Sequence, residues 1–296
     1  MKKRYLIALD MDGTLLDDKK EISKETKEYL KYLENDGNVI AIASGRPLRA
    51  IMPYYNEIGL TGPIACYNGA CVLDPINKKL ETKLSKINKE IIKKIIEKIG
   101  VDNFSNIMCE TSEDAWVLHD NLTIEDFFWK DGIRIHEGNI VEILDEDPHT
   151  AIFVLKNHDF DEKIVKIAFS YENIGCRFWG DSTCCELYFL DVNKGSAIGD
   201  MAKAYGIDNN NTIAIGDAEN DEDLLRAAYK GVAMKNASDE LISQADMVSL
   251  EDNNHDGVKK TLSNLKNMKL SAILLRNIGK HIRKTLAHLW VILMQN

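Results

Sequence analysis

Short apolar runs alternate with amphipathic segments in the first part of the chain. Residues 5–9 and 39–43 are apolar without interruption, which is typical of strands covered on both faces of a parallel sheet. Between them, apolar residues recur at helical spacing, at Ile22, Tyr29, Leu30 and Leu33. Ser23 is a candidate N-cap, so we expect a helix from Ser23 to Asn35. This strand–helix–strand order predicts a parallel sheet.

The last third of the chain repeats this alternation. The expected helices span residues 196–205, 221–228 and 256–265, and the expected strands span residues 212–215, 231–234 and 246–250. The last third of the chain is therefore expected to belong to the same α/β domain as the first part.

The middle of the chain has a different pattern. Its expected helices span residues 87–99 and 160–171, and its strand-like runs include 151–155 and 184–190. This mixture predicts an α+β domain inserted into the α/β domain, with borders near Glu81 and Leu190.

Charge and cysteine content narrow the classes of partner and compartment. The formal net charge is −10, which argues against nucleic acid, because phosphate backbones require clustered Lys and Arg. A small anionic substrate remains compatible, since a few local cations can hold one phosphate. The six cysteines form neither a CxxC pair nor a Cys/His metal spacing, so we expect a reducing, cytoplasmic compartment. The apolar run after Arg4 is too short for the core of a signal peptide.

Polar segments follow the first two expected strands. Asp10-Met11-Asp12-Gly13-Thr14 places two carboxylates at a strand end, where one can attack phosphorus and the other can handle protons. Ala43-Ser44-Gly45-Arg46 offers a hydroxyl and backbone N–H groups for phosphate oxygens. Each segment also has a purely structural interpretation, as a turn with a capping Asp and as a common Ser-Gly loop.

Two further polar segments lie in the last third of the chain. Asn193-Lys194-Gly195 precedes an expected helix, and its ammonium group can offset charge on a transferring phosphoryl group. Gly216 to Asp221 follows an expected strand, and its carboxylates suit an oxygen-ligand Mg²⁺ site. A solvated lysine and an acidic helix N-terminus are the structural alternatives. Open parallel sheets bind ligands at the carboxyl ends of their strands, so one shared site explains all four segments together.

In this order, the four segments resemble the motifs of the haloacid dehalogenase-like superfamily. The second acid, Asp12, resembles the phosphatase branch of that family. The chain from Asp12 to Ser44 has room for only one helix, whereas the 150 positions from Ser44 to Lys194 can hold a large cap domain. A cap in this place is similar to that of the type IIB, or Cof-like, members, and the resemblance covers roughly residues 4–265.

Smaller segments add to the Cof-like resemblance. They are Tyr67-Asn68-Gly69-Ala70, Val232-Ala233-Met234 with Asn236-Ala237, and Asp256-Gly257-Val258. Lys235 departs from the family, which usually has Gly there, and the acid Asp191 stands where the family is often less charged. These departures leave the expected chemistry intact and the substrate open.

The resemblance implies a fold and a reaction. The fold is a Rossmann-like parallel-sheet core formed by residues 1–81 and 191–267, with an α+β cap domain over residues 82–190. The reaction is Mg²⁺-dependent hydrolysis of small phosphorylated metabolites, such as sugar phosphates, through an aspartyl-phosphate intermediate.

The resemblance also implies roles for individual residues. Asp10 is the nucleophile, Asp12 is the acid and base, and Lys194 assists catalysis. For Asp12 to carry a proton near neutral pH, its site must raise its pKa above the ordinary value. The implied substrate-binding residues are Ser44, Gly45, Arg46, Asn68 and Asn220. The implied metal-binding residues are Asp10, Asp12 through its backbone carbonyl, Asp217 and Asp221.

Two rival functions and one further segment stay open at this point. A phosphomutase of the same architecture and a non-enzymatic regulator that binds phosphometabolites are the rivals. Residues 268–296 combine an apolar stripe at helical spacing with basic residues and contain no acid. They predict a basic amphipathic helix that contacts a membrane surface or a protein through residues 270–296, or packs on its own chain.

Overall fold

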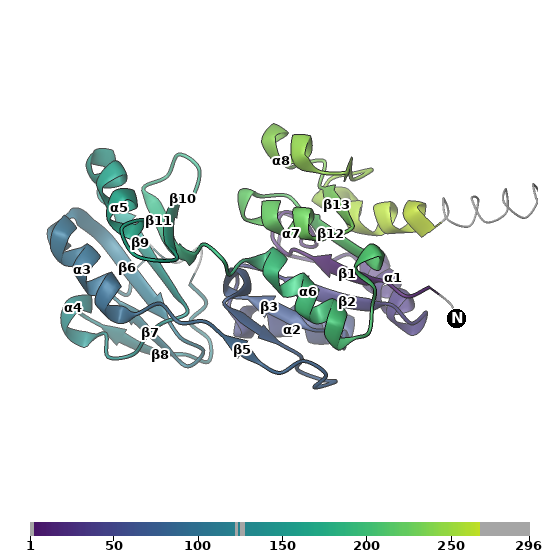
Figure 1. Ribbon diagram of the computed structural model, residues 1–296, viewed down its shortest axis with the longest axis horizontal. Helices are drawn as coiled ribbons and strands as arrows, with labels where there is room; N and C mark the ends of the chain where they lie inside the picture. The colour runs from purple at the N-terminus through teal and green to yellow at the C-terminus, as the bar shows by residue number, and fades with distance from the viewer. Residues whose placement is uncertain (1–2, 122–123, 125–127, 267–296) are drawn as a thin grey trace, which may run out of the picture.

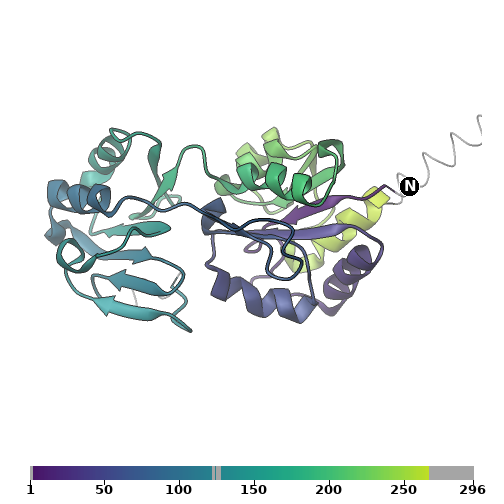
Figure 2. The same ribbon diagram turned by 60° about the horizontal axis from the view of Figure 1, so that its bottom comes forward.

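Two β-sheets organise the molecule. The computed structural model describes residues 3–121, 124 and 128–266. The sheets form two lobes that lie side by side, and the chain passes between the lobes after β5 and again after β11 (Figure 1, Figure 2). The expected basic helix over residues 268–296 lies outside the described residues. Within the described residues, no helix is both long enough and apolar enough to cross a membrane.

The first sheet is mainly parallel. Its strands, in spatial order, are β14 (Met247–Val248), β13 (Lys230–Ala233), β12 (Thr212–Gly216), β1 (Leu6–Leu9), β2 (Val39–Ala43), β3 (Ile64–Cys66), β4 (Cys71–Leu73) and β5 (Lys83–Leu84). From β14 to β3 all neighbours are parallel, and β4 and β5 add an antiparallel edge. Leu6 of the central strand β1 pairs with Val39 on one side and Thr212 on the other.

Helices cover both faces of the first sheet, which explains why β1, β2 and β3 are apolar throughout. One face packs against α1 (Lys24–Asn35), α2 (Leu48–Ile58) and a helix over residues 257–266. The other face packs against α6 (Lys194–Ala204), α7 (Glu222–Ala227) and α8 (Asp239–Gln244). Ser23 caps α1 as expected, because its side chain accepts a hydrogen bond from the backbone N–H of Thr26.

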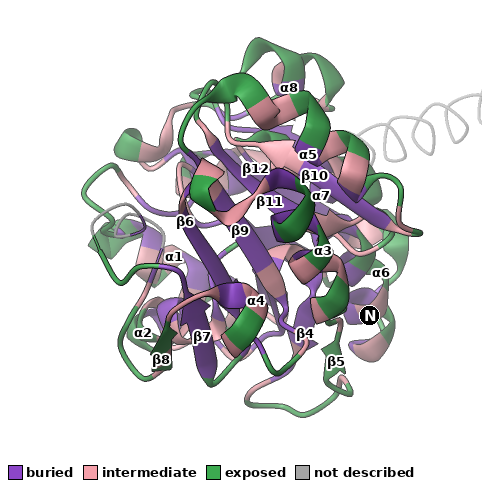
Figure 3. Cartoon of the chain, turned by 90° about the vertical axis from the view of Figure 1, so that its left-hand side faces the viewer, coloured by how far each residue is buried: buried purple, intermediate pink, exposed green. Residues whose placement is uncertain are grey.

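The second sheet belongs to the inserted domain. Its strands, in spatial order, are β10 (Ile174–Phe178), β11 (Cys184–Phe189), β9 (Thr150–Leu155), β6 (Phe104–Glu110), β7 (Asp114–Val117) and β8 (Arg134–Glu137). All neighbours are antiparallel except β7 and β8. The helices α3 (Lys89–Ile99), α4 (Ile140–Ile143) and α5 (Asp161–Ala168) pack on its outer face, where buried strands lie behind half-exposed helices (Figure 3).

The predicted fold class is confirmed: an α+β domain is inserted into an α/β core with a parallel sheet. The border between them differs slightly from the expected one. β5 pairs with β4 in the first sheet, so residues 83–84, which we expected in the inserted domain, belong to the core sheet. A two-residue edge strand carries too short a pattern to be seen in the sequence.

Candidate functional site

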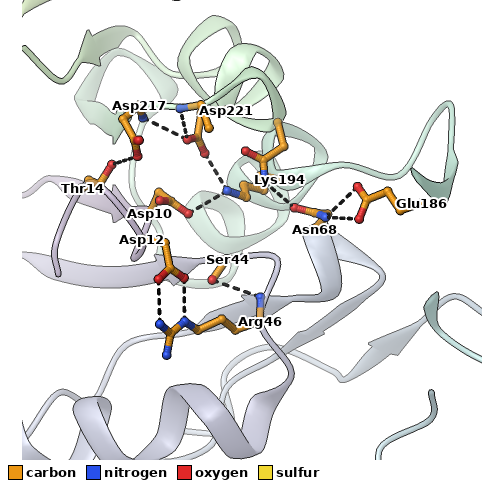
Figure 4. A network of polar contacts seen from close by, with 12 residues as sticks. Asp10, Asp12, Thr14, Ser44, Arg46, Asn68, Glu186, Lys194, Asp217 and Asp221 are labelled. Carbon is orange, nitrogen blue, oxygen red and sulfur yellow. Dashed lines mark hydrogen bonds and ion pairs between the residues drawn. The ribbon is translucent and has the colours of Figure 1, made fainter. Parts of the chain in front are cut away.

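The predicted polar segments meet at the carboxyl edge of the first sheet. Asp10 follows β1, Ser44 follows β2 and Asp217 follows β12, and these three strands are neighbours. The backbone N–H of Asp10 donates to the carbonyl of Ile215 at 3.0 Å, which ties the first segment to the last. Figure 4 shows their side chains converging on one space. Parallel strands end at the same edge, which is why segments about 200 positions apart come together.

Lys194 lies at the centre of the site. It is the first residue of α6, whose N-cap Asn193 accepts a hydrogen bond from the backbone N–H of Ser196. The side chain is 1% exposed, and its Nζ lies 2.7 Å from Oδ1 of Asp10 and 2.7 Å from Oδ1 of Asp221. Burial alone would lower the pKa of Lys194, but these two carboxylates raise it above its ordinary value. Lys194 is therefore a fixed positive charge at neutral pH.

Three carboxylates form an acidic cluster around this lysine. Ligand oxygens of Asp10, Asp217 and Asp221 all lie within 4.8 Å of one another. Thr14 donates to Oδ1 of Asp217 at 2.7 Å, and Oδ2 of Asp221 accepts the N–H of Asp217 at 3.0 Å. Burial and the carboxylate of Asp221 raise the pKa of Asp10 well above its ordinary value and that of Asp217 to about 6. Burial is the larger cause of both pKa shifts, and repulsion between the carboxylates adds to it.

This donor set fits a hard divalent cation. All three side chains offer oxygen atoms, which are the ligands that Mg²⁺ prefers, whereas Zn²⁺ sites are built mainly from Cys and His. A dication would also relieve the repulsion that raises the pKa of Asp10 and Asp217. The residues present therefore suit Mg²⁺ in number, chemistry and charge.

Asp12 points away from the acidic cluster. Its carboxylate forms a two-pronged ion pair with Arg46, at 2.6 Å to Nε and 2.7 Å to Nη2, and a further ion pair with Lys20 at 2.7 Å. Burial raises the pKa of Asp12, but the hydrogen bonds from Arg46 and Lys20 outweigh it, and the pKa is lowered. Our expectation that the site raises this pKa is wrong for the arrangement in the structure, because Arg46 was not foreseen as its partner.

Arg46 connects the part of the site around Asp12 to the inserted domain. Its guanidinium carbon lies 4.8 Å from the ring centroid of Trp129, which comes from the inserted domain, and 5.5 Å from that of Tyr54. Its backbone N–H donates to Oγ of buried Ser44 at 3.2 Å. The position of Gly45, beside Asn68, leaves little space for a side chain.

Asn68 joins three parts of the structure. It lies in the turn between β3 and β4 with a φ of 53°, a left-handed conformation that Asn tolerates better than most residues. Its Oδ1 accepts a hydrogen bond from Asn220 at 2.9 Å, and its Nδ2 donates to Oε1 of Glu186 at 3.2 Å. The sequence predicted Asn68 and Asn220 near the substrate, and the structure places them in direct contact.

A second contact joins the two domains and was missed in the sequence. Arg49 of α2 reaches Glu110 of β6 at 2.8 and 2.7 Å, and its Nε donates to the carbonyl of Trp129 at 2.7 Å. Tyr67 also donates to Glu110, at 2.5 Å. Glu110 ends one apolar strand-like run and Glu186 lies within another. A carboxylate in an apolar strand is seldom buried without a partner, and this pattern could have identified both residues from the sequence.

A cavity of about 420 Å³ lies between the two domains above this edge. Asp10, Asp12 and Ser44 line its inner end, and side chains of β6, β9 and β10 line the opposite wall. Phe178, Trp179 and Gly180 are among the lining residues. Its size is within the usual range for small-molecule sites, about 300–1,000 Å³.

The family model of haloacid dehalogenase-like hydrolases matches residues 7–262. The chain belongs to this family. The insertion between Ser44 and Lys194 is thus the cap domain of a haloacid dehalogenase-like hydrolase, in the place expected for type IIB members.

Relatives and solved structures agree with this assignment. A 5-amino-6-(5-phospho-D-ribitylamino)uracil phosphatase of Bacillus subtilis is 31% identical over 267 residues, which are 88% of this chain and 97% of that protein. A haloacid dehalogenase-like hydrolase from Bacteroides thetaiotaomicron superposes with a TM-score of 0.75 at 25% identity, covering 89% of this chain and all of that one. A subclass IIB sugar phosphatase of the same superfamily shares the fold, with a TM-score of 0.74 at 20% identity over 88% of this chain and 99% of that one.

Gly13 is expected to be essential for the position of Asp217. It has a φ of 73°, and a Cβ there would lie 2.2 Å from Oδ2 of Asp217. We expect Gly13→Ala to lower the free energy of unfolding by at least about 2 kcal/mol, since it combines left-handed strain with a clash. Gly37→Ala is the matched control, because Gly37 has a φ of 93° with open space around it and costs only the strain, about 1 kcal/mol. Equal losses in urea unfolding would contradict the proposed clash.

The acidic cluster is expected to make the metal-free protein less stable as the pH rises. The pKa of Asp217 is raised to about 6, mainly by burial, so the folded state holds its proton more tightly than the unfolded state. The contribution of Asp217 to stability therefore falls between about pH 4 and pH 6, so the wild type should lose roughly 1–2 kcal/mol relative to Asp217→Asn over this range. Urea unfolding with EDTA across this range measures the effect, and Asp217→Asn serves as the control with a flatter profile. A difference in stability between the wild type and Asp217→Asn that does not change over this range would refute the prediction.

Proposed function

We propose that this hydrolase is a Mg²⁺-dependent phosphatase that acts on small phosphorylated metabolites through an aspartyl-phosphate on Asp10. One observation carries the proposal. The buried ammonium of Lys194 lies 2.7 Å from Asp10, which lines the inner end of the cavity and forms an acidic cluster with two more carboxylates. Binding alone requires no carboxylate in such a position, whereas nucleophilic attack on phosphorus does.

Asp10 attacks the phosphorus atom, and the ester oxygen leaves on the side of Asp12. Asp12 gives that oxygen a proton, and later takes one from the water that hydrolyses the aspartyl-phosphate. Lys194, Ser44 and the backbone N–H groups near Gly45 bind the phosphoryl oxygens, where negative charge develops. Arg46 and Asn220 contact the substrate from the sides of the cavity.

The structure adds one requirement to this scheme. Asp12 is paired with Arg46, and that pairing lowers its pKa, which is unfavourable for a proton donor near pH 7. We propose that the phosphate group of the substrate binds the guanidinium of Arg46 and thereby replaces Asp12 as its partner. Asp12 is then left half-buried with fewer cationic partners, which raises its pKa.

Asp10, Asp217 and the backbone carbonyl of Asp12 would hold the Mg²⁺ ion, with Asp221 beside them. When bound, the ion neutralises the negative charge that would otherwise keep a carboxylate and a phosphate apart. Six free and buried cysteines support our placing of the enzyme in a reducing, cytoplasmic compartment.

Phosphate release from a panel of phosphorylated metabolites, with Mg²⁺ or with EDTA, tests the proposal. The panel includes hexose phosphates, nucleotides and 5-amino-6-(5-phospho-D-ribitylamino)uracil, the compound in the name of the Bacillus subtilis relative. Mg²⁺-dependent release of inorganic phosphate supports a phosphatase. Formation of an isomeric sugar phosphate without free phosphate would instead support a phosphomutase, and ligand binding without turnover would support a regulator.

A further inference from the structure

The cavity has two chemically different ends. At the core end it is polar and charged, with Asp10, Asp12 and Ser44. At the cap end its lining is largely apolar and aromatic, with Trp129, Phe178, Trp179, Met108 and Ile152. The phosphate group belongs at the first end, so the second end must receive the rest of the substrate.

The contacts of Asp12 give the direction in which the leaving group extends. Under the proposed function, the ester oxygen lies beside Asp12. Arg46 lies next to Asp12 at 2.6 Å, and Trp129 lies next to Arg46, with 4.8 Å between the guanidinium carbon and the ring centroid. A leaving group that follows this line passes Arg46 and reaches the indole of Trp129.

The position of Trp129 is fixed from the core domain. Arg49 of α2 donates through Nε to the backbone carbonyl of Trp129 at 2.7 Å, and the same guanidinium binds Glu110 through both of its other nitrogens. Glu110 is 1% exposed, so this is a buried and rigid anchor. The indole therefore belongs to the built wall of the cavity.

Four polar side chains near the cap wall, two from the cap and two from the core, are already engaged with one another. Arg177 donates through Nε to Glu186 at 2.7 Å, and Glu186 also accepts a hydrogen bond from Asn68, which in turn accepts one from Asn220. A sugar with many hydroxyl groups would have to compete with these bonds, because each buried hydroxyl needs a partner. A flat ring with an apolar face needs only the aromatic surface.

We propose that the substrate is a phosphate monoester whose leaving group carries a planar heteroaromatic ring, and that this ring packs on Trp129 and Trp179. The inference rests on the proposed phosphatase function and names its substrate class. Trp129 and Trp179 are specificity-determining residues in this assignment, while Asp10, Asp12 and Lys194 do the chemistry. Stacking of a heteroaromatic base on an aromatic side chain contributes enough for a preference of about tenfold or more.

Two matched pairs of compounds test the inference. Uridine 5′-phosphate and ribose 5-phosphate share the phosphorylated ribose and differ in the ring. 5-Amino-6-(5-phospho-D-ribitylamino)uracil and ribitol 5-phosphate make the same comparison on an open chain. We expect kcat/KM to be at least about tenfold higher for the ring-bearing member of at least one pair. Ratios near or below one in both pairs would overturn the ring assignment while leaving the phosphatase intact.

The tryptophans supply the second arm of the test. We expect Trp129→Leu and Trp179→Leu to reduce the ring preference, which is the ratio of kcat/KM within each pair, about fivefold or more. Trp116→Leu is the matched control, because Trp116 is buried in the cap and stacks on His136 instead of lining the cavity. Loss of the preference in the control alone, or in none of the variants, would refute the proposed stacking.

Binding separates failure of this inference from failure of the proposed function. The affinities of both pairs for Asp10→Asn are measured by calorimetry with Mg²⁺. If no compound is hydrolysed by the wild type, the phosphatase proposal fails, and a ring preference in affinity still supports the ring site. Equal affinities within both pairs overturn the ring site whether or not there is turnover.

Discussion

Asp10→Asn is expected to lower phosphate release by at least about 10⁴-fold, because the amide cannot attack phosphorus and no neighbouring carboxylate has its position. Asp217 and Asp221 lie in the same cluster, but Asp221 is held by Lys194 and two backbone N–H groups, and Asp217 is held by Thr14. Phosphate release at saturating Mg²⁺ and substrate measures the loss. The wild type, quenched in acid during turnover, should carry phosphate on the peptide that contains Asp10.

Stability provides the control for this variant. Burial and Asp221 raise the pKa of Asp10, which means that its charged form is unfavourable in the folded metal-free protein. Asn has the same shape without the charge. We therefore expect Asp10→Asn to be at least as stable as the wild type in urea with EDTA. An inactive variant that is also less stable would indicate damage to the fold, and substantial remaining activity would exclude Asp10 as the nucleophile.

Lys194→Met is expected to reduce both activity and stability. The ammonium group is buried between Asp10 and Asp221, so its removal leaves two buried carboxylates without their cation. Breaking a buried ion pair in this way costs about 3–5 kcal/mol. We expect the free energy of unfolding in EDTA at pH 7 to fall by about 3 kcal/mol, and phosphate release with Mg²⁺ to fall by about 10³-fold, because a donor to the phosphoryl group is lost.

A second lysine of α6 provides a control that removes a lysine side chain without breaking a buried ion pair. Lys203 is exposed in the last turn of α6, so Lys203→Met should change stability by less than about 0.5 kcal/mol. The double variant Asp10→Asn with Lys194→Met should recover part of the stability that Lys194→Met loses, because it removes one of the two unpaired charges. If the changes in unfolding free energy of the two single variants simply add in the double variant, the two side chains are not directly coupled.

The sequence by itself determined the α/β core, the insertion and the edge at which the site lies. The uninterrupted apolar runs at residues 5–9 and 39–43 are the strands β1 and β2, because strands buried on both faces have no polar positions. Asp10, Ser44 and Asp217 each follow such a strand, so their convergence was predictable from strand order alone.

The contacts of Lys194 were predictable only in part. The sequence predicted that its ammonium lies near the transferring phosphoryl group and just before a helix, and the structure makes Lys194 the first residue of α6. Its exact partners depend on how α6 packs against the first sheet, where Ala197 and Met201 are buried. Packing of this kind joins residues that are far apart in the chain, and no local pattern records it.

The tertiary structure alone decided which polar side chains pair, both within the core and across the two domains. Arg46 neutralises Asp12, Arg49 binds Glu110, and Asn68 bonds to Glu186, although 34 to 118 positions separate these partners. The pKa of Asp12 depends on one of these pairings, and for this reason its direction was expected wrongly from the motif. Periodicity reports which residues are buried, whereas the pairing of these side chains depends on how the loops of the core lie against one another and on how the cap sits on the core. The sequence thus determined the edge of the sheet at which the site lies. The packing of the core loops decided the partner of Asp12, and the docking of the cap decided the contacts between the domains and the aromatic wall of the cavity.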